Sequence, residues 1–322
     1  MPRVLICAYT GHSSCGDEGI IDRLLRITGK SSTLITDNGE KVAKMHGART
    51  VGRYDIPGIM REMMLSDLLI LGGGTLLQRR TSTRSLLYYS AIAQAALAAG
   101  LPYVIYGGID DDSPITKAVI RGAKELYLRD SHSMKTAKSM GAGGKCVFAP
   151  DPVLIPIKRK REQTGDYLVC SPRFDDLRSV EAAAEYGKRE RLKVIYAAMH
   201  PCDKGVCLRS AMRYGGSAVI NDDYTKLEEL IKGARVVLSS RLHPCVIAYS
   251  GRVPFAAFSD DFKLKAFARD VGMESACMSS GGADDVSKIA AGFDFDRLEQ
   301  LRKYAYAGLK GIRLSALGSH GR

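Results

Sequence analysis

The sequence has 322 residues, which is long enough for two domains of about 150 residues, each with a core of its own. Hydrophobic residues make up 45% and charged residues 25% of the chain, as in ordinary globular proteins. No apolar run reaches the roughly 18 residues of a membrane-spanning helix, and the opening MPRVLICAY lacks the regions of a signal peptide. The 8 cysteines form no CxxC pair, which argues against a metal site or a disulfide framework and favours a reducing cytoplasm.

The formal net charge of +12 favours anionic partners, such as phosphorylated small molecules, anionic lipid surfaces or nucleic acid. Nucleic acid is disfavoured, because the chain has no tryptophan, only 7% aromatic residues and no basic stripe interleaved with stacking rings. The densest basic run, residues 158–161, indicates a solvated connector rather than a docking patch. A weak peripheral contact with the inner face of an anionic membrane stays open, since each basic residue near such a surface contributes about 1 kcal/mol.

In the first half of the chain, short apolar runs alternate with helical patterns, which is typical of a doubly wound parallel sheet. We expect strands at 4–9, 32–37, 67–72, 102–109, 125–130 and 146–151, and helices at 16–28, 56–67 and 85–99. The second half repeats the pattern, with strands at 166–173, 193–200, 217–221, 236–240 and 253–258 and helices near 180–190, 207–214, 224–233 and 263–271.

A polar, charged stretch separates the two halves. The chain therefore divides into an N-terminal Rossmann-like domain (1–155), a linker (156–166) and a C-terminal Rossmann-like domain (167–322). The last amphipathic stretch, 296–317, is expected to pack back on the first domain. The predicted fold class is α/β, with two doubly wound domains.

Cationic side chains follow several predicted strands of the second half. Arg241 and His243 come directly after the strand at 236–240, Arg173 lies at the C-terminal edge of the strand at 166–173, and His200 ends the strand at 193–200. In an open α/β sheet, ligands bind outside the carboxyl ends of the strands, beside helix N-termini. The spacing is typical of an anion site, although an ordinary ion pair at Arg241 and a capping role for His243 would also explain it.

A second group of candidates lies near the N-terminus. Gly16 permits a tight turn, and Asp17 and Glu18 open the following helix, where carboxylates suit the helix dipole. That role alone explains both acids. The alternative is that they bind or deprotonate a sugar hydroxyl.

The run GGGT after the strand at 67–72 lets backbone N–H groups of Gly73 and Gly74 approach a ligand. It is neither a Walker A sequence nor a spaced GxGxxG, so it indicates only a general cradle for an anion or a hydroxyl. Arg84, near the start of a helix, opposes the helix dipole and calls for an anionic partner.

Seven stretches together resemble one family. SSRLHPCVIAYSGRVPFAAFSDDFK and DLLILGGGTLLQRRTSTRSLLYYSAIAQAALAAGLPYVIYGGI are similar to the two signatures of the polysaccharide pyruvyltransferases. GHSSCGDEGI, RDSHSMKTAKSMGA, APDPVL, SPRFDD and AAMHPCDKG follow in the family's order, so that the resemblance covers residues 4 to about 270.

The resemblance implies a glycosyltransferase-B-like arrangement, in which the two domains face a cleft, and transfer of pyruvate from phosphoenolpyruvate to a sugar as a cyclic ketal, with release of phosphate. The acceptor would be a sugar of a cell-surface polysaccharide or a lipid-linked precursor. Phosphoenolpyruvate is then a co-substrate, and no other cofactor and no metal are expected. The candidates for donor and acceptor binding are Arg173, His200, Arg241, the backbone of Leu242, Lys263, Gly73, Gly74 and Arg84. His243 is the first choice for acid–base chemistry and Asp17 or Glu18 the second.

The chain departs from the family pattern in three places. GHSSCGDEG is one residue longer than the usual loop, Asp260 and Phe262 replace a common Tyr and Pro, and Arg79 replaces an acid. The RLH core is intact, so the departures concern the acceptor more than the donor. Two other functions stay open: a glycosyltransferase of the same architecture with a nucleotide-sugar donor, and a non-catalytic module that binds anionic glycans or lipids. The acceptor sugar and the oligomeric state are not specified by the sequence.

Overall fold

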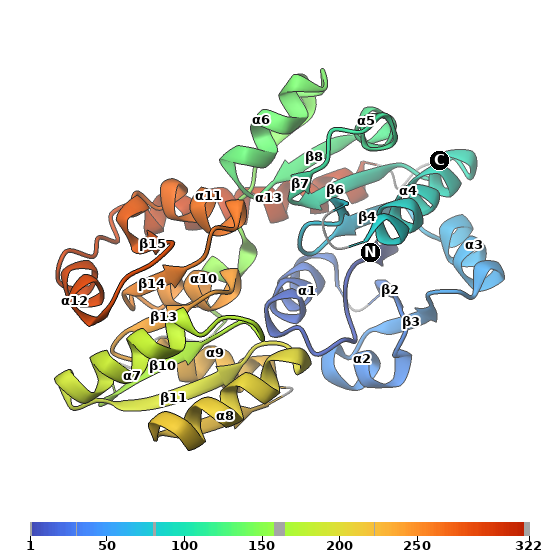
Figure 1. The fold of residues 1–322 in the computed structure, drawn as a ribbon. Coiled ribbons are helices and arrows are strands. Elements are labelled where there is room, and N and C mark those ends of the chain that lie inside the picture. Colours follow the sequence, from blue (N-terminus) through green and yellow to red (C-terminus); the bar gives the residue numbers. More distant parts are fainter. Residues whose placement is uncertain (1, 30, 80–81, 158–164, 222, 319–322) are drawn as a thin grey trace. The chain divides into compact units, whose positions relative to one another are not determined.

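The computed structural model describes residues 2–29, 31–79, 82–157, 165–221 and 223–318. The chain forms two compact units (Figure 1). Unit 1 comprises Met1–His12, Ile20–Pro152 and Arg302–Arg322, and unit 2 comprises Ser13–Gly19 and Val153–Leu301. The basic run at 158–161 and most of the expected linker lie outside the described residues.

The described part of unit 1 is built on a parallel sheet of seven strands, in the order β3-β2-β1-β4-β6-β8-β9. The chain winds outward from β1 in both directions, which is the doubly wound topology expected from the sequence. The strands are β1 (Val4–Cys7), β2 (Thr33–Thr36), β3 (Arg49–Gly52), β4 (Leu68–Gly72), β6 (Tyr103–Gly107), β8 (Glu125–Leu128) and β9 (Cys146–Phe148). The central strands β1, β2, β4 and β6 are buried along their whole length, because helices cover both faces.

The helices of this part of the chain begin at side-chain caps. Ser82 caps α4 by accepting a hydrogen bond from the N–H of Ser85, and Asp130 caps α6 through the N–H of Ser133. The helices are α1 (Cys15–Thr28), α2 (Gly39–His46), α3 (Ile56–Leu65), α4 (Thr83–Ala98), α5 (Pro114–Gly122), α6 (Ser131–Ser139) and the short turn η1 (Gly143–Lys145), and β5 (Leu77–Gln78) pairs with β7 (Ile109–Asp110). The first residues of α1 belong to unit 2.

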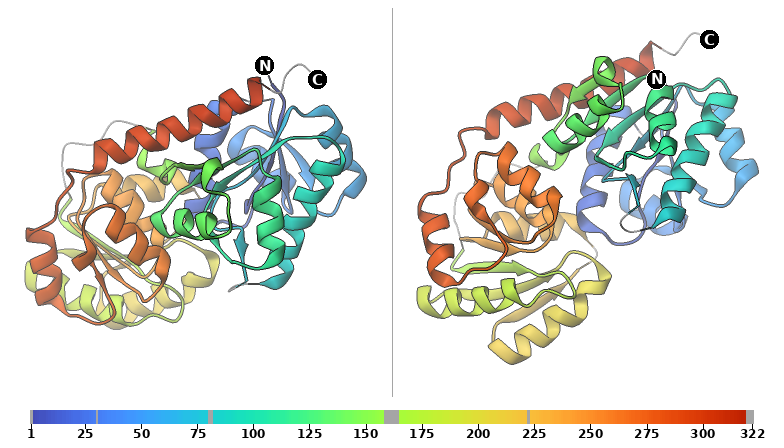
Figure 2. Two further views of the ribbon diagram at one scale, coloured as in Figure 1. Left: turned by 90° about the horizontal axis from the view of Figure 1, so that it is seen from above. Right: turned by 45° about the horizontal axis from the view of Figure 1, so that its top comes forward.

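The last helix, α13 (Leu298–Leu317), joins unit 1 from Arg302 onward. Figure 2 shows it along the sheet, on the face away from α4. A Cβ atom at Gly308 would lie 2.5 Å from the Cβ of Ala149, and one at Gly311 would lie 2.7 Å from the Tyr127 hydroxyl. The two glycines therefore let the helix approach the sheet closely.

The described part of unit 2 contains a parallel sheet of six strands in the order β12-β11-β10-β13-β14-β15. The strands are β10 (Tyr167–Ser171), β11 (Lys193–Ala198), β12 (Ser217–Ile220), β13 (Val237–Ser239), β14 (Phe255–Phe258) and β15 (Cys277–Met278). The helices are α7 (Arg178–Glu190), α8 (Lys204–Tyr214), α9 (Tyr224–Lys232), α10 (Leu242–Ser250), α11 (Phe262–Asp270) and α12 (Ala283–Ala291), with short turns η2 (Pro152–Leu154), η3 (Pro201–Asp203) and η4 (Glu274–Ala276).

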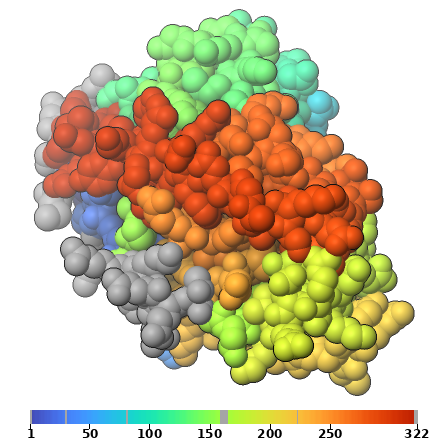
Figure 3. Space-filling model, turned by 90° about the vertical axis from the view of Figure 1, so that its left-hand side faces the viewer, coloured from blue at the N-terminus to red at the C-terminus, as the bar shows by residue number. Residues whose placement is uncertain are grey.

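Helices far apart in the chain cover the outer face of unit 2. Figure 3 shows α12, in orange-red, beside α7, in yellow-green. The Arg189 guanidinium joins them, with an ion pair to Asp284 at 2.5 Å and a hydrogen bond to the carbonyl oxygen of Ala283.

Candidate functional site

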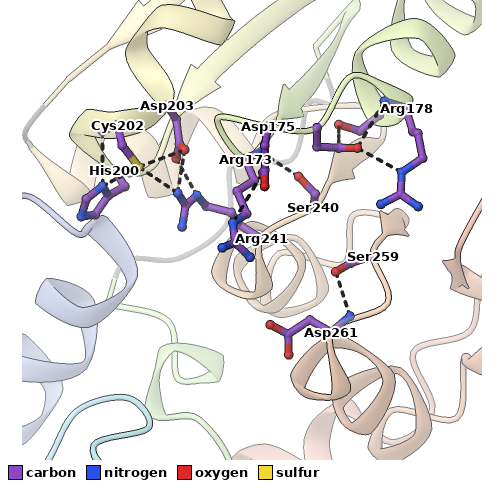
Figure 4. Close-up of polar contacts among 12 residues, drawn as sticks. Arg173, Asp175, Arg178, His200, Cys202, Asp203, Ser240, Arg241, Ser259 and Asp261 are labelled. Carbon is purple, nitrogen blue, oxygen red and sulfur yellow. Dashed lines mark hydrogen bonds and ion pairs between the residues drawn. The ribbon is translucent and has the colours of Figure 1, made fainter. Parts of the chain in front are cut away.

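The carboxyl ends of β10 and β13 lie side by side in unit 2. Ser171 pairs with Ser239 in the parallel register, and the Ser239 hydroxyl donates to the Ser171 carbonyl oxygen at 2.7 Å. The backbone N–H of Arg173 donates to the Ser240 hydroxyl at 2.7 Å. These bonds tie the two loops together and bring Arg173 and Arg241, which are far apart in the sequence, to one edge of the sheet (Figure 4).

Arg241 is bound to a carboxylate that the sequence analysis did not assign to the site. Its Nη2 lies 2.6 Å from Oδ1 of Asp203, and its Nε lies 2.5 Å from Oδ2. Asp203 follows β11, the strand on the far side of β10, and its side chain is fully buried. The ion pair considered from the sequence is therefore present, as a clamp in which the carboxylate is fully buried and the Arg241 side chain is 26% exposed.

The clamp leaves part of the guanidinium for other partners. A guanidinium has five N–H donors, and Asp203 takes up the edge formed by Nε and Nη2. Burial opposes the charge of Arg241, but the hydrogen bonds and charge of Asp203, with the Cys202 thiol, raise its pKa above the ordinary value. Arg173 makes a loose contact, 3.6 Å between its Nε and Oδ1 of Asp175, with both side chains about half exposed, and its guanidinium lies 5.7 Å from the centre of the Phe174 ring. Such a surface pair contributes little and leaves Arg173 able to bind an anion.

His200 contacts its own loop. Its Nδ1 lies 2.9 Å from the Cys202 Sγ and accepts a hydrogen bond from the Cys202 N–H at 3.3 Å. The Cys202 Sγ in turn lies 3.3 Å from Nη2 of Arg241 (Figure 4). His200 is thus connected to the Arg241 guanidinium through an exposed thiol.

The thiol of Cys202 gives a test of this geometry. Partial burial and the nearby Asp203 raise the pKa of Cys202 and outweigh the opposing effect of Arg241. Because only the thiolate is alkylated, we expect the reaction of Cys202 with iodoacetamide to be slow at neutral pH and to keep accelerating above the pH at which a free cysteine levels off. Mass spectrometry of the modified peptide, with Cys202→Ser as the control, measures this profile. A rate that levels off earlier than that of free cysteine would contradict the arrangement.

Leu242 and His243 form the first turn of α10, directly after Arg241 as its N-cap residue. The first N–H groups of a helix have no partner within the helix, so the Leu242 backbone can face an anion as the sequence suggested. His243 is half-buried, and its ring lies against the backbone of Gly16.

Asp17 and Glu18 lie in unit 2 and not in the first domain, where the sequence analysis placed them. They belong to residues 13–19, which group with unit 2. The N–H of Cys15 donates to the carbonyl oxygen of Met199 at 3.1 Å, which fixes this segment beside the end of β11. Both acids therefore share a unit with His243.

Lys263 lies in the first turn of α11, which follows the end of β14. Asp261 caps this helix, since its Oδ1 accepts from the Lys263 N–H at 2.9 Å, and its own N–H donates to Ser259. The Lys263 ammonium lies 5.8 Å from the centre of the Phe262 ring. Lys263 thus stands at the same edge of the sheet, one strand beyond Arg241.

Gly73 and Gly74 of unit 1 allow the backbone conformation of the loop after β4. Gly73 and Gly74 have φ angles of 88° and 112°, which only glycine adopts readily. The Gly73 N–H donates to the Tyr106 carbonyl at 3.1 Å, and the Gly74 carbonyl accepts from Gly108 at 2.8 Å. The Gly73 N–H is therefore engaged within the fold and does not form the ligand cradle expected from the sequence. Arg84 is exposed in the first turn of α4.

A buried arginine holds these loops together. Nη2 of Arg129 donates to the Thr75 hydroxyl at 2.8 Å, and its Nε lies 3.4 Å from Oδ2 of Asp130. The same Asp130 caps α6. The RDS motif of the sequence is therefore structural in this unit. Among the residues that the structure describes, no group of three or more His, Cys, Asp and Glu side chains is placed to hold a metal ion.

Comparisons with known proteins bear on both the fold and the site. A family model described as "Polysaccharide pyruvyl transferase" matches residues 17–261. Among curated proteins, none matches the chain in sequence.

Solved structures resemble the whole chain. A putative UDP-N-acetylglucosamine 2-epimerase from Listeria monocytogenes has a TM-score of 0.64 at 12% identity, with 99% of this chain and 96% of that chain covered. A UDP-GlcNAc 2-epimerase from Neisseria meningitidis bound to UDP-GlcNAc has a TM-score of 0.63 at 10% identity, with 98% and 100% covered. The spinosyn rhamnosyltransferase SpnG has a TM-score of 0.51 at 12% identity, with 99% and 95% covered. Likenesses at such low identity concern the fold, and they confirm the predicted α/β class of glycosyltransferase-B-like proteins.

Proposed function

Because the chain belongs to the polysaccharide pyruvyl transferase family, we propose that it transfers pyruvate from phosphoenolpyruvate to a sugar of a cell-surface polysaccharide or its precursor. The product is a cyclic ketal and the leaving group is phosphate. The proposed donor site is the carboxyl edge of the unit 2 sheet, where Arg173, Arg241 and His243 follow two neighbouring strands.

The observation that carries the proposal is the pair of arginines at this edge, one clamped and one loosely held. Phosphoenolpyruvate has a carboxylate and a phosphate, both charged at neutral pH. A planar guanidinium binds such groups with two parallel hydrogen bonds, which a lysine ammonium does not. Asp203 fixes the orientation of Arg241, and Arg173 is able to adjust to the second anionic group. The Leu242 backbone and Lys263 stand at the same edge as further donors.

The chemistry requires two additions to the same carbon. A sugar hydroxyl gives up its proton to a base as its oxygen attacks C2 of phosphoenolpyruvate, and the electron pair of the C2–C3 double bond takes up a proton at the methylene carbon C3, which forms a C–O bond and a methyl group. A second hydroxyl of the same sugar then displaces phosphate from C2, and its proton leaves with a base. An imidazole is able to deliver or accept a proton near neutral pH, so His243 is the first candidate for the transfer to C3.

Asp17 and Glu18 are the candidates for the base that activates a hydroxyl. Asp17 is held by a hydrogen bond from the Ser14 hydroxyl at 2.5 Å, which orients its carboxylate. Glu18 is almost fully buried. Both lie within three residues of Gly16, against which the His243 ring packs. The acid, His243, and the base, Asp17 or Glu18, would therefore come from two separate segments of unit 2. Arg84 stays a candidate for the acceptor, from unit 1.

The cellular setting follows from the same proposal. A precursor of a surface polysaccharide is assembled on the cytoplasmic side, so we place the protein there, with a weak attraction of the +12 chain to anionic lipid. None of the helices in the described part of the chain is both long and apolar enough to cross a bilayer.

A nucleotide-sugar donor is the second candidate, because several of the similar structures are UDP-GlcNAc 2-epimerases, and two of these structures contain bound UDP-GlcNAc. Thermal unfolding with each ligand separates the two. A ligand that binds only the folded protein stabilises it by about 2.7 kcal/mol at a hundred times its dissociation constant. We expect phosphoenolpyruvate to raise the melting temperature and UDP and UDP-GlcNAc to leave it unchanged. The reverse result would favour a glycosyltransferase, and stabilisation by anionic glycans alone would favour a binding module.

A further inference from the structure

The ring of His243 occupies the space where Gly16 would carry a side chain. A Cβ atom built on Gly16 would lie 1.9 Å from Cγ and from Nδ1 of the imidazole, and 2.5 Å from the Cβ of His243. No pair of non-bonded atoms approaches so closely. Alanine, the smallest replacement, therefore cannot occupy position 16 unless the imidazole or the helix moves.

The need for glycine here is one of space and not of backbone conformation. Gly16 is the second residue of α1 and is helical, not at the tight turn that the sequence suggested. Glycine weakens a helix relative to alanine, so local structure alone would favour alanine at this position. The close contact with His243 supplies the reason for glycine.

Both sides of the contact are anchored in unit 2. On the Gly16 side, the Cys15 N–H donates to Met199 after β11, and the Cys15 thiol donates to the Asn221 carbonyl oxygen after β12 at 3.8 Å. On the other side, His243 lies in the first turn of α10, whose remaining residues are buried. The backbone at Gly16 and the backbone at His243 are therefore both unable to shift easily. An added methyl group at position 16 would displace the imidazole itself.

We infer that Gly16 is a positioning residue for His243: the bare helix turn at Gly16 is the wall against which the imidazole is held at the strand edge that carries Arg241. The inference rests on the proposed role of His243 in proton transfer. A displacement of about 1 Å at a reacting group costs on the order of 100-fold in rate, so the effect on turnover is expected to be large.

A double-mutant cycle tests the inference. The four proteins are the unchanged chain, Gly16→Ala, His243→Gly and the double variant, and the matched control is Gly144→Ala, where an added Cβ meets nothing within 4 Å. Two quantities are measured for each: the turnover number for phosphate release from phosphoenolpyruvate with a sugar acceptor, and the midpoint of thermal unfolding. The dissociation constant of phosphoenolpyruvate is measured alongside.

We expect Gly16→Ala alone to lower the turnover number by about 100-fold, with little change in the dissociation constant of phosphoenolpyruvate, and to lower the melting temperature. In the His243→Gly background the same substitution should lower neither the remaining turnover number nor the melting temperature, because both the ring and the Cβ atom that the added methyl group would meet are gone. Gly144→Ala should behave as the unchanged protein.

The outcomes separate the inference from the proposed function. Equal losses of turnover and stability in both backgrounds would show that glycine serves α1 alone, and the inference would be overturned. Full activity of Gly16→Ala would overturn it as well. If His243→Gly is as active as the unchanged protein, the proposed role of His243 fails, while the melting temperatures of the four proteins still decide whether the two residues are coupled.

Discussion

Arg241→Lys is expected to lower kcat/KM for phosphoenolpyruvate by about 100-fold, or roughly 2.7 kcal/mol of transition-state stabilisation. Lysine keeps the positive charge, so the buried carboxylate of Asp203 keeps a cationic partner. It lacks the planar fork, and a single ammonium group is unable both to pair with Asp203 and to bind a donor oxygen with two parallel hydrogen bonds. Acceptor-dependent phosphate release at several donor concentrations measures the loss.

The choice of lysine over alanine matters for the interpretation. Arg241→Ala would leave Asp203 buried without a counter-charge, at a cost of about 3–5 kcal/mol in stability, and lost activity would then have two explanations. Arg189→Lys is the matched control, because Arg189 also pairs with an aspartate in unit 2, on the packed face between α7 and α12. Unchanged kcat/KM in Arg241→Lys, or an equal loss in Arg189→Lys, would end the assignment of Arg241 to the donor site.

His243→Gln is expected to reduce kcat by between about 100-fold and 10,000-fold while phosphoenolpyruvate still binds. Glutamine is polar and similar in length, but it does not deliver a proton to the methylene carbon. The arginines proposed to bind the donor are unaltered, so the dissociation constant should change little. Calorimetric titration gives binding, and single-turnover phosphate release gives the chemical step.

Arg241→Lys and His243→Gln are expected to change different kinetic quantities, and this difference distinguishes the roles of the two residues. Arg241→Lys should act mainly on the affinity for the donor, and His243→Gln mainly on the rate of the bound complex. Weaker binding with an unchanged rate in His243→Gln would make the imidazole a donor ligand and transfer the acid–base role to Asp17 or Glu18.

The central strands were predictable because burial on both faces demands continuous apolar runs. β4 and β13 show this pattern, and their carboxyl ends located the glycine loop and Arg241 correctly at strand edges. The strands β3 and β15 were not predicted. Both lie at sheet edges and are partly exposed, so that their residues give no such run.

The composition of the candidate site was only partly predictable. The sequence indicated Arg173, His200 and Arg241 one by one, since each follows a strand. The ion pair of Asp203 with Arg241, 38 residues away, depends on the order of the strands in the sheet. A local pattern does not contain that order.

The roles of the glycines could also not be predicted fully from the sequence. The sequence gives a glycine no marker that distinguishes a ligand cradle, a tight turn or a close packing contact. Gly73 proved to be bonded within its own unit, and Gly16 proved to be needed for the volume of a histidine more than 200 residues away. Asp17 and Glu18 belong to unit 2 together with Gly16, although all three lie near the N-terminus. Residues 13–19 group with unit 2 by their contacts in the fold and not by their position in the chain.

The most direct test is to incubate the protein with phosphoenolpyruvate and a panel of aryl hexosides, and to measure phosphate and product mass together. The account predicts phosphate release only when an acceptor is present, in equal amount to a product that has gained one pyruvyl ketal. Phosphate release without any pyruvylated product, or a product formed only from a nucleotide sugar, would contradict it.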